Sequence, residues 1–324
     1  MRLPTHDDVQ AARARISAHI VRTPLLRHPL LDQLTGGTIL IKAEPLQRTG
    51  SFKLRGATNA ILQLNEAQRR AGVVTHSSGN HGQATACAAA SVGAQATIFM
   101  PADAPRIKVE STRRWGAEII HYDRAIDDRE ALTRAHAERT GAVLVPPFDH
   151  ADVIAGQGTL ALELAEDVKA AGLAMDALLV CTGGGGLIAG CALGIEGVSP
   201  ATRVYAVEPD GWDDTARSLA TGERLANAPG GSTLCDALLS RQPGEITFAL
   251  NRERLAGGLV VTDAEVLAAI AFAFSHLKLV VEPGGAVCLA ALLAGKFDAK
   301  GKVVGAVVSG GNVDPAVFGR ALAA

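Results

Sequence analysis

Short apolar runs and amphipathic stretches alternate along most of the chain. Runs such as Ala-Leu-Leu-Val and Val-Val-Gly-Ala-Val-Val are continuously apolar, which is typical of parallel strands buried on both faces. Between them lie Ala-rich stretches whose apolar residues recur every three or four positions, a spacing that favours helices. The predicted strands are 37–44, 73–77, 96–100, 118–122, 143–145, 177–181, 204–207 and 303–308. The predicted helices are 53–64, 80–92, 106–115, 127–139, 158–170, 187–193, 264–277 and 286–294.

This alternation predicts an α/β fold with two open, mostly parallel twisted sheets covered by helices. Residues 69–149 contain four of the predicted strands and three of the helices, enough for a small α/β domain. We therefore expect this domain to be inserted into a large domain formed by residues 1–68 and 150–324. Residues 227–258 are rich in Gly, Pro and Arg with little periodicity, so we expect a long connection or an interface segment there.

The composition is typical of a globular enzyme. Of the 324 residues, 48% are hydrophobic and 20% are charged, and the formal net charge is −2. Without a basic block, nucleic acids and anionic membranes are poor partners. The five cysteines are widely separated and form no C-x-x-C pair, which indicates small buried side chains in a reducing compartment. With no signal-peptide core and no apolar run that could span a bilayer, we expect a cytoplasmic protein.

One lysine lies at the junction between a polar turn and an apolar helix, directly after an aromatic residue. It is Lys53, in the segment 49–57, Thr-Gly-Ser-Phe-Lys-Leu-Arg-Gly-Ala. Partial desolvation at such a junction favours the neutral amine, which is the form that makes a Schiff base with an aldehyde. An isolated Ser-Phe-Lys is more often a helix start whose lysine faces water, so other motifs must decide.

Four glycine-bearing turns follow apolar stretches, most of them predicted strands. Because ligands gather at the carboxyl ends of strands in open α/β sheets, such loops can converge. The run Thr-Gly-Gly-Gly-Gly at 182–186 is the phosphate candidate, since it leaves backbone N–H groups uncovered at a helix start. The other turns are Ser-Ser-Gly-Asn-His-Gly at 77–82, Glu-Pro-Gly-Gly at 282–285 and Ser-Gly-Gly-Asn at 309–312.

The glycine run also fits a dinucleotide fingerprint. Gly184, Gly186 and Ala189 satisfy G-x-G-x-x-A, and Glu208 lies 22 residues beyond Gly186. A tight turn without a ligand is a further alternative. A nicotinamide enzyme, however, needs neither Ser-Phe-Lys nor Ser-Ser-Gly-Asn-His-Gly. Pyridoxal phosphate explains all four motifs, because its aldehyde needs a lysine, its phosphate a glycine cradle, its ring hydroxyl a donor and its pyridine nitrogen a partner.

Together these motifs resemble the fold-type II pyridoxal phosphate enzymes, specifically the threonine dehydratase, serine racemase and hydroxyaspartate dehydratase group. The resemblance covers nearly the whole chain. It implies a tryptophan synthase β-like fold, pyridoxal 5′-phosphate as cofactor, an amino acid substrate and a homodimer. The matching motifs are 51–57, 77–82, 155–159, 183–186 and 309–312.

The resemblance implies a role for each motif residue. Lys53 would carry the cofactor aldehyde, with Phe52 beside the ring and Glu282 lining the pocket near it. Asn80 would bond the ring hydroxyl, and Ser309 would meet the pyridine nitrogen. A helix cap is the alternative for Asn80, and the two roles are compatible. The phosphate would lie on the backbone N–H groups of Gly183, Gly184, Gly185, Gly186 and Leu187. The substrate carboxylate would be received by Ser77, Ser78, Gly79, Asn80 and His81.

Ser309 bears on the chemistry. A serine cannot hold a pyridinium as an aspartate would, so the ring nitrogen should stay largely neutral and the electron sink weaker. This favours elimination of a β-leaving group over reactions that need a lasting carbanion. We therefore expect Lys53 to take the Cα proton of a β-hydroxy amino acid, whose hydroxyl leaves as water assisted by the cofactor phosphate. The products would be a 2-oxo acid and ammonia.

Ser78 and Arg129 bear on which reaction and which substrate. In the racemases the position of Ser78 holds a serine that acts as acid/base on the opposite ring face, so it permits racemisation; alternatively it bonds carboxylate or backbone. Arg129 matches an arginine that approaches the distal group of the substrate in racemases and hydroxyaspartate dehydratases. Since arginine binds carboxylates bidentately, it would favour acidic substrates. A solvated helix-surface arginine is the alternative.

Residues 208–214, Glu-Pro-Asp-Gly-Trp-Asp-Asp, resemble the divalent-cation site of serine racemases. Glu208, Asp214 and the Trp212 carbonyl would supply hard oxygen ligands to Mg²⁺ or Ca²⁺. Surface carboxylates without a metal are the alternative.

The leading hypothesis is a pyridoxal phosphate-dependent dehydratase (ammonia-lyase) for a β-hydroxy amino acid of the L-threonine or L-serine type. The alternatives are a serine racemase, a 3-hydroxyaspartate dehydratase or a phenylserine dehydratase. A nicotinamide oxidoreductase and a non-enzymatic cofactor carrier or amino-acid sensor remain as other classes. The β-substituent is open, because pocket width depends on loops around Phe148 and residues 228–232.

Overall fold

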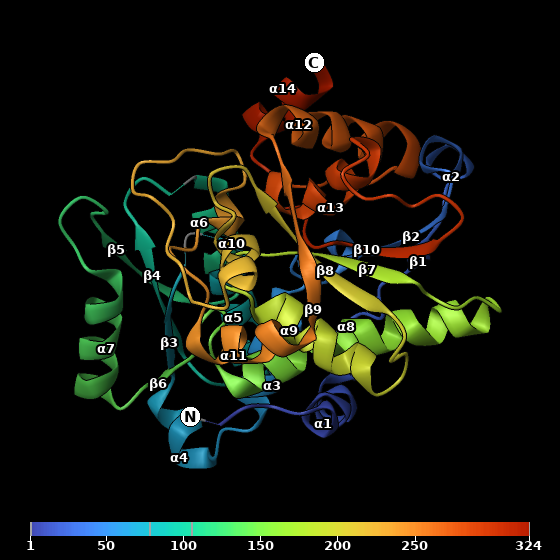
Figure 1. Cartoon of the computed structure of the whole chain (residues 1–324). Coiled ribbons are helices and arrows are strands. Elements are labelled where there is room, and N and C mark those ends of the chain that lie inside the picture. Colours follow the sequence, from blue (N-terminus) through green and yellow to red (C-terminus); the bar gives the residue numbers. More distant parts are fainter. Residues whose placement is uncertain (1, 78, 105, 324) are drawn as a thin grey trace.

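The computed structural model describes residues 2–77, 79–104 and 106–323, which form two open sheets covered by helices (Figure 1). The larger sheet has the order β1-β2-β10-β7-β8-β9 and the smaller one the order β5-β4-β3-β6. All neighbouring strands are parallel except β1 and β2, so the predicted fold class is confirmed. The strands are β1 (Leu25–Leu26), β2 (Thr38–Ala43), β3 (Val73–His76), β4 (Ala96–Pro101), β5 (Glu118–Tyr122), β6 (Val143–Leu144), β7 (Ala177–Cys181), β8 (Arg203–Pro209), β9 (Leu255–Val261) and β10 (Val303–Val308).

Helices cover both faces of the larger sheet. In Figure 1, α12, α13 and α14 lie on one face, and α8 and α9 lie on the other. The helices are α1 (His6–Ile16), α2 (Pro29–Thr35), α3 (Lys53–Leu62), α4 (Glu66–Ala71), α5 (Asn80–Ser91), α6 (Arg106–Arg113), α7 (Arg129–Thr140), α8 (Ala151–Ala170), α9 (Gly186–Glu196), α10 (Asp214–Thr221), α11 (Glu245–Arg254), α12 (Asp263–Phe272), α13 (Pro283–Leu293) and α14 (Pro315–Ala323). Short helical turns are η1 (Glu44–Leu46), η2 (Asp236–Leu238) and the π-helical η3 (Ala273–Leu277).

Each sheet has its own apolar core. In the larger sheet, the strands β7, β8 and β10 pack against α9 and α13, with Leu179 and Val207 fully buried. In the smaller one, Ile98 of β4 packs with α5 and with the apolar face of α3, including Leu54 and Ile61. Because α3 belongs to this second core, it ties the two halves of the chain together at the position of Lys53. The division into residues 69–149 and the remainder stays a prediction.

Two predictions about elements were wrong. The segment 227–258 was expected to be a long connection or an interface segment with little periodicity, but it contains α11 and most of β9. The strand β9 was missed because its glycines are not typical of a strand. A Cβ at Gly258 would lie 2.5 Å from Ala216 of α10, so the close packing of this helix requires glycine there. Likewise α8 begins at Ala151 rather than at 158, because its glycines do not break it. A Cβ at Gly158 would lie 2.4 Å from the carbonyl oxygen of Gly190, so this glycine allows α8 and α9 to touch.

The cysteines behave as predicted for small apolar side chains, since all five are buried and none is in a disulfide. Within the described ranges, no helix combines the length and the apolar character that crossing a membrane requires. The expected compartment stays a prediction.

Candidate active site

A cavity of about 700 Å³ lies where strands of both sheets end. Its walls include residues that directly follow β3, β7 and β10, so the glycine turns and Lys53 converge as predicted. The predicted cofactor and substrate residues that line it are Phe52, Lys53, Ser77, Gly79, Asn80, His81, Arg129, Gly183, Gly184, Gly185, Gly186, Leu187, Glu282 and Ser309. Ser78, the predicted acid/base residue, lies outside the described residues.

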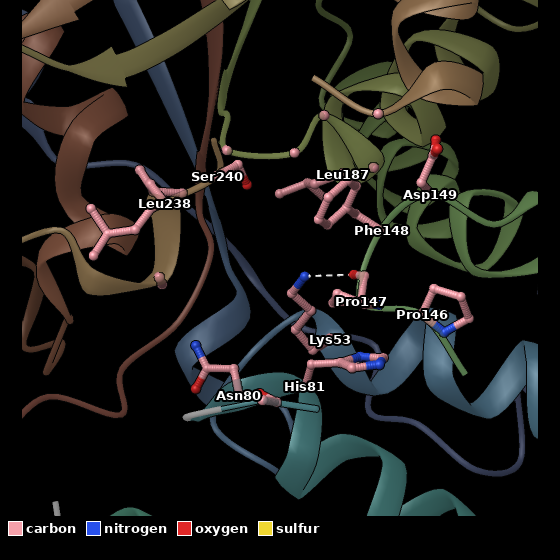
Figure 2. A pocket seen from close by; sticks show the side chains of 18 of the residues that line it. Lys53, Asn80, His81, Pro146, Pro147, Phe148, Asp149, Leu187, Leu238 and Ser240 are labelled. Atoms are coloured by element: carbon pink, nitrogen blue, oxygen red, sulfur yellow. Dashed lines mark hydrogen bonds between the residues drawn. The ribbon is translucent and has the colours of Figure 1, made fainter. Parts of the chain in front are cut away.

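Lys53 is the first residue of α3, and its side chain points into the cavity between Asn80 and Phe148 (Figure 2). Its Nζ donates a hydrogen bond to the Pro147 carbonyl at 2.8 Å and lies 5.1 Å from the centroid of the Phe52 ring. Burial lowers the pKa of Lys53 to about 8. Lys53 is half-buried by its accessible surface, which agrees with the predicted partial desolvation and not with a fully exposed helix-start lysine.

The start of α3 is held from two sides. The backbone N–H of Phe52 donates to the Ser309 carbonyl at 3.0 Å, which joins this turn to the end of β10. Below it, the fully buried Arg55 pairs with Glu44 at 2.9 Å and with Glu163 at 2.7 Å. Losing one partner of such a buried pair leaves an uncompensated charge, which is strongly destabilising. These contacts keep the lysine in register with the cavity.

The glycine loop between β7 and α9 cannot carry side chains. A Cβ at Gly184 would lie 2.5 Å from the Phe148 ring, and one at Gly186 would lie 2.9 Å from backbone and side-chain atoms of Phe148. Gly185 has a φ of +89°, in the left-handed region that favours glycine. The loop therefore presents backbone to the cavity at the start of α9, which fits a phosphate group.

A directional chain of hydrogen bonds ends at Glu282. Asn312 Nδ2 donates to the Thr49 carbonyl at 2.8 Å and to Asn80 Oδ1 at 2.7 Å. Asn80 Nδ2 in turn donates to Glu282 Oε1 at 2.5 Å. Because a backbone carbonyl can only accept, the direction of the whole chain is set, and the amide nitrogen of Asn80 faces Glu282. The N-cap of α5 is Gly79, so the helix-cap alternative for Asn80 is wrong.

Two acidic groups with raised pKa values lie in the cavity with Ser309, the residue expected to meet the pyridine nitrogen. Ser309 directly follows β10 and is buried, and both Ser309 and Cys181 line the cavity. Burial raises the pKa of Cys181 to about 11, so the thiol keeps its proton at neutral pH. Burial, followed by the charge of Asp236, raises the pKa of Glu282 to about 7. This surrounding fits a ring nitrogen that stays largely unprotonated.

The substrate end carries two histidines that stay neutral. His81 Nε2 lies 2.9 Å from the Val145 carbonyl, and burial lowers the pKa of His81 to about 3. Burial, followed by the charge of Arg129, lowers the pKa of His76 to about 4. Arg129 is exposed and lines the same cavity. This position is compatible with substrate contact and with a solvated surface residue, so its role stays a prediction.

The predicted metal ligands lie apart from the cavity. Glu208 is the second-last residue of β8 and accepts the backbone N–H groups of Thr215 and Ala216 at 3.0 and 2.8 Å. Asp214 Oδ1 accepts from Asn227 at 2.6 Å, while its Oδ2 is buried without a hydrogen-bond partner. Both carboxylates are fully buried. The alternative of surface carboxylates is therefore wrong.

The pKa values of both carboxylates are raised above their ordinary values. Burial, followed by the charge of Asp214, raises the pKa of Glu208 to about 8, and burial raises that of Asp214 to about 6. Among the described residues, no group of three or more His, Cys, Asp or Glu side chains is arranged to hold a metal ion. The predicted site contains fewer acidic groups than that, because it consists of two carboxylates and the backbone carbonyl of Trp212. The buried, unpartnered Oδ2 fits a hard cation, and the site stays a prediction.

Sequence reasoning missed several polar residues that line the cavity or support its walls. Lys108 of α6 pairs with Asp236 of η2, which links the smaller sheet to the larger one. Asp149, Thr247 and Asn251 contact the glycine loop or the helix α11 beside it. The Pro-Gly-Glu that precedes the apolar positions of α11 was a usable signal of a helix start. No local pattern distinguished the polar residues themselves.

A lysine of lowered pKa, placed in one cavity with a loop shaped for a phosphate, is what pyridoxal phosphate chemistry requires. Carried on two parallel-stranded sheets, this arrangement defines the fold-type II class. The sequence profile of the family described as pyridoxal-phosphate dependent enzyme matches residues 16–310. The chain belongs to this family and uses pyridoxal phosphate, which decides against the dinucleotide alternative.

The chain is similar to proteins with more than one activity. It is 45% identical to an L-threo-3-hydroxyaspartate ammonia-lyase of a Pseudomonas species over 97% of both chains. It is 43% identical to the serine racemase of Schizosaccharomyces pombe, covering 96% of this chain and 95% of the relative. The solved structure of maize serine racemase aligns with a TM-score of 0.93 at 38% identity, over 99% of this chain and 98% of that one. The protein therefore lies in the ammonia-lyase and racemase group.

Proposed function

We propose that the protein is an ammonia-lyase that dehydrates a β-hydroxy amino acid of the L-threonine or L-serine type to a 2-oxo acid and ammonia. The observation that carries the proposal is Lys53, an amine inside the cavity whose pKa is lowered to about 8. Such an amine can accept a proton near neutral pH, whereas an ordinary lysine stays charged. Serine at position 309 supports elimination over reactions that need a protonated ring.

Each part of the cavity has a task in this reaction. When bound, pyridoxal phosphate supplies the aldehyde for the substrate amine and an electron sink for the bond that breaks at Cα. The glycine loop and Leu187 hold the phosphate group, and Asn80 and Ser309 orient the ring. Lys53 removes the proton from Cα of the substrate. The loop before α5 receives the substrate carboxylate, since helix N-termini favour anions.

The test is a product assay over several substrates. Serine, threonine, 3-hydroxyaspartate and phenylserine are incubated with the holoenzyme, with and without Mg²⁺, and 2-oxo acid, ammonia and D-amino acid are measured. Ammonia release from threonine or serine, and its loss in Lys53→Ala, is the expected result. Predominant D-serine from L-serine would make the protein a racemase, and no ammonia from any substrate would exclude a lyase.

A second substrate, 3-hydroxyaspartate, is favoured by the charges at the substrate end. Arg129, Arg134 and Lys108 line the cavity there, and guanidinium groups bind carboxylates bidentately. The name of the Pseudomonas relative supports the same substrate. A preference for 3-hydroxyaspartate over threonine in the assay above would select this alternative.

We also propose a bound Mg²⁺ or Ca²⁺ and a homodimer. Glu208 and Asp214 would contribute carboxylate oxygens to the cation, together with the Trp212 carbonyl. Support for the dimer comes from large apolar side chains that are 43–47% exposed, among them Phe274 and Val280. Calcium titration calorimetry and light scattering test the two proposals separately.

A further inference from the structure

The orientation of the phosphate donors depends on where the carbonyl groups of the glycine loop point. In a planar trans peptide, the C=O of one residue and the N–H of the next point in opposite directions. Whatever holds the carbonyls of Gly184 and Gly185 away from the cavity therefore turns the N–H groups of Gly185 and Gly186 toward it.

The helix α11 holds these carbonyls. Thr247 Oγ1 donates to the Gly184 carbonyl at 2.7 Å, and the backbone N–H of Gly244 adds a longer bond to the same oxygen at 3.3 Å. The Gly185 carbonyl accepts the backbone N–H of Ala189 in α9 at 3.0 Å, and Asn251 Nδ2 reaches the same oxygen at 3.5 Å, a weaker contact. Thr247 is 0% and Asn251 is 1% exposed. Water therefore cannot take the place of either side chain without a rearrangement.

The position of α11 is in turn set by Asp149. Its carboxylate accepts the first backbone N–H groups of the helix, those of Glu245 and Ile246 at 2.9 Å and that of Thr247 at 3.1 Å. In Figure 2 the Asp149 side chain points away from Lys53. An anion at a helix N-terminus is favoured by the unpaired N–H groups there. The two residues before Asp149 contact the site directly. Phe148 lies against the glycine loop, and the Pro147 carbonyl accepts a hydrogen bond from Lys53 Nζ.

We propose that Thr247 is a positioning residue for the phosphate of the cofactor, with Asn251 as a weaker second contact and Asp149 as the anchor of the helix that carries both. Thr247 is not among the residues that line the cavity. It holds the Gly184 carbonyl outward, so that the adjacent N–H is presented to the phosphate before the cofactor arrives. This inference rests on the proposed use of the glycine loop as the phosphate site.

The test removes the Thr247 hydroxyl and keeps its shape. Thr247→Val is compared with Thr75→Val, because Thr75 is also 0% exposed and its hydroxyl is buried without a hydrogen-bond partner. The apoenzymes are titrated with pyridoxal phosphate, with inorganic phosphate and with pyridoxal, which lacks the phosphate. A lost neutral hydrogen bond corresponds to about tenfold in a dissociation constant.

The expected result separates the phosphate from the ring. Thr247→Val should bind pyridoxal phosphate and inorganic phosphate about tenfold more weakly, with pyridoxal affinity changed less than about twofold. Thr75→Val should match the wild type for all three ligands. Equal weakening of pyridoxal phosphate and pyridoxal would show a general structural role, and unchanged phosphate affinity would overturn the inference.

Two further variants keep the test decisive if Thr247→Val does not fold. Thr247→Ser retains the hydroxyl and should keep the phosphate affinity of the wild type, while Thr247→Ala should lose it. Equal phosphate affinity in these two variants would contradict the inference. A wild-type protein that fails to bind pyridoxal phosphate would instead overturn the proposed function, so the two failures are distinguishable.

Discussion

The two ends of the cavity are built from different kinds of groups. At the phosphate end the inward surface is the backbone of Gly183–Gly186, and side chains are excluded by Phe148 and α11. At the substrate end the surface is made of side chains, including Asn80, His81 and the exposed Arg129. Backbone N–H groups are present whatever the side chains are, whereas the substrate end depends on particular side chains. The comparison suggests that cofactor affinity resides at the first end and substrate choice at the second.

The largest effect is expected from Gly185→Ala at the phosphate end. The new alanine would have to adopt a φ of +89°, and its Cβ would lie 2.9 Å from Asn251 Nδ2. The left-handed conformation alone costs about 1–2 kcal/mol, and with the clash we expect pyridoxal phosphate affinity to fall about a hundredfold. Absorbance titration of the apoenzyme measures it. Gly93→Ala is the control, because its φ is +69° and nothing lies within 4 Å of its Cβ; equal affinities in the two variants would refute the backbone account.

A smaller and more selective effect is expected from Arg129→Ala at the substrate end. If its guanidinium binds a distal carboxylate, KM for 3-hydroxyaspartate should rise about tenfold. KM for L-serine and the affinity for pyridoxal phosphate should stay within about twofold. Arg139→Ala, on the same helix α7, is the matched control. If serine and 3-hydroxyaspartate respond alike, Arg129 plays no part in substrate choice.

A third prediction concerns Lys53, which lies between the two ends. Because burial lowers its pKa to about 8, the rate at which the apoenzyme forms its chromophore with pyridoxal phosphate should rise with pH and level off above about pH 8. A lysine with an ordinary pKa would let the rate rise to about pH 10.4. Stopped-flow absorbance across this pH range gives the midpoint of the rate increase, with Nα-acetyl-lysine as the reference amine. A midpoint near that of the reference would show that the amine is not desolvated.

The smallest effect is expected at the buried pair away from the cavity. Burial, followed by the charge of Asp214, raises the pKa of Glu208 to about 8, so the folded state binds this proton more tightly than the unfolded chain. The stabilisation is complete below pH 4.5, the ordinary value, and is lost as pH rises toward 8. In EDTA, the Tm of the wild type should fall by a few degrees more than the Tm of Glu208→Gln as the pH rises from 4.5 to about 8. Glu138→Gln, at an exposed site, is the control, and parallel melting curves for the wild type and Glu208→Gln would contradict the raised pKa.

Much of the cavity was predictable because its signals are local. The apolar strands, the glycine turns that follow them and Lys53 at a helix start are short patterns, and the structure brings all of these turns into one cavity. The wrong predictions concern segments in which glycines are required by contacts with other elements and not by a local sequence pattern. Gly158 is typical of a helix end, but it lies within α8 and permits the contact with α9. Gly258 is unusual in a strand, but it permits the contact between β9 and α10.

The sequence by itself determined the fold class and the cofactor, because short motifs carry them, and it placed Lys53 at a helix start among these motifs. Only the tertiary structure decided how these parts are oriented. Thr247 lies 63 residues from Gly184, and Asn312 lies 232 residues from Asn80. The direction of a carbonyl or of an amide is set by its neighbour in space, and no periodicity along the chain records that neighbour.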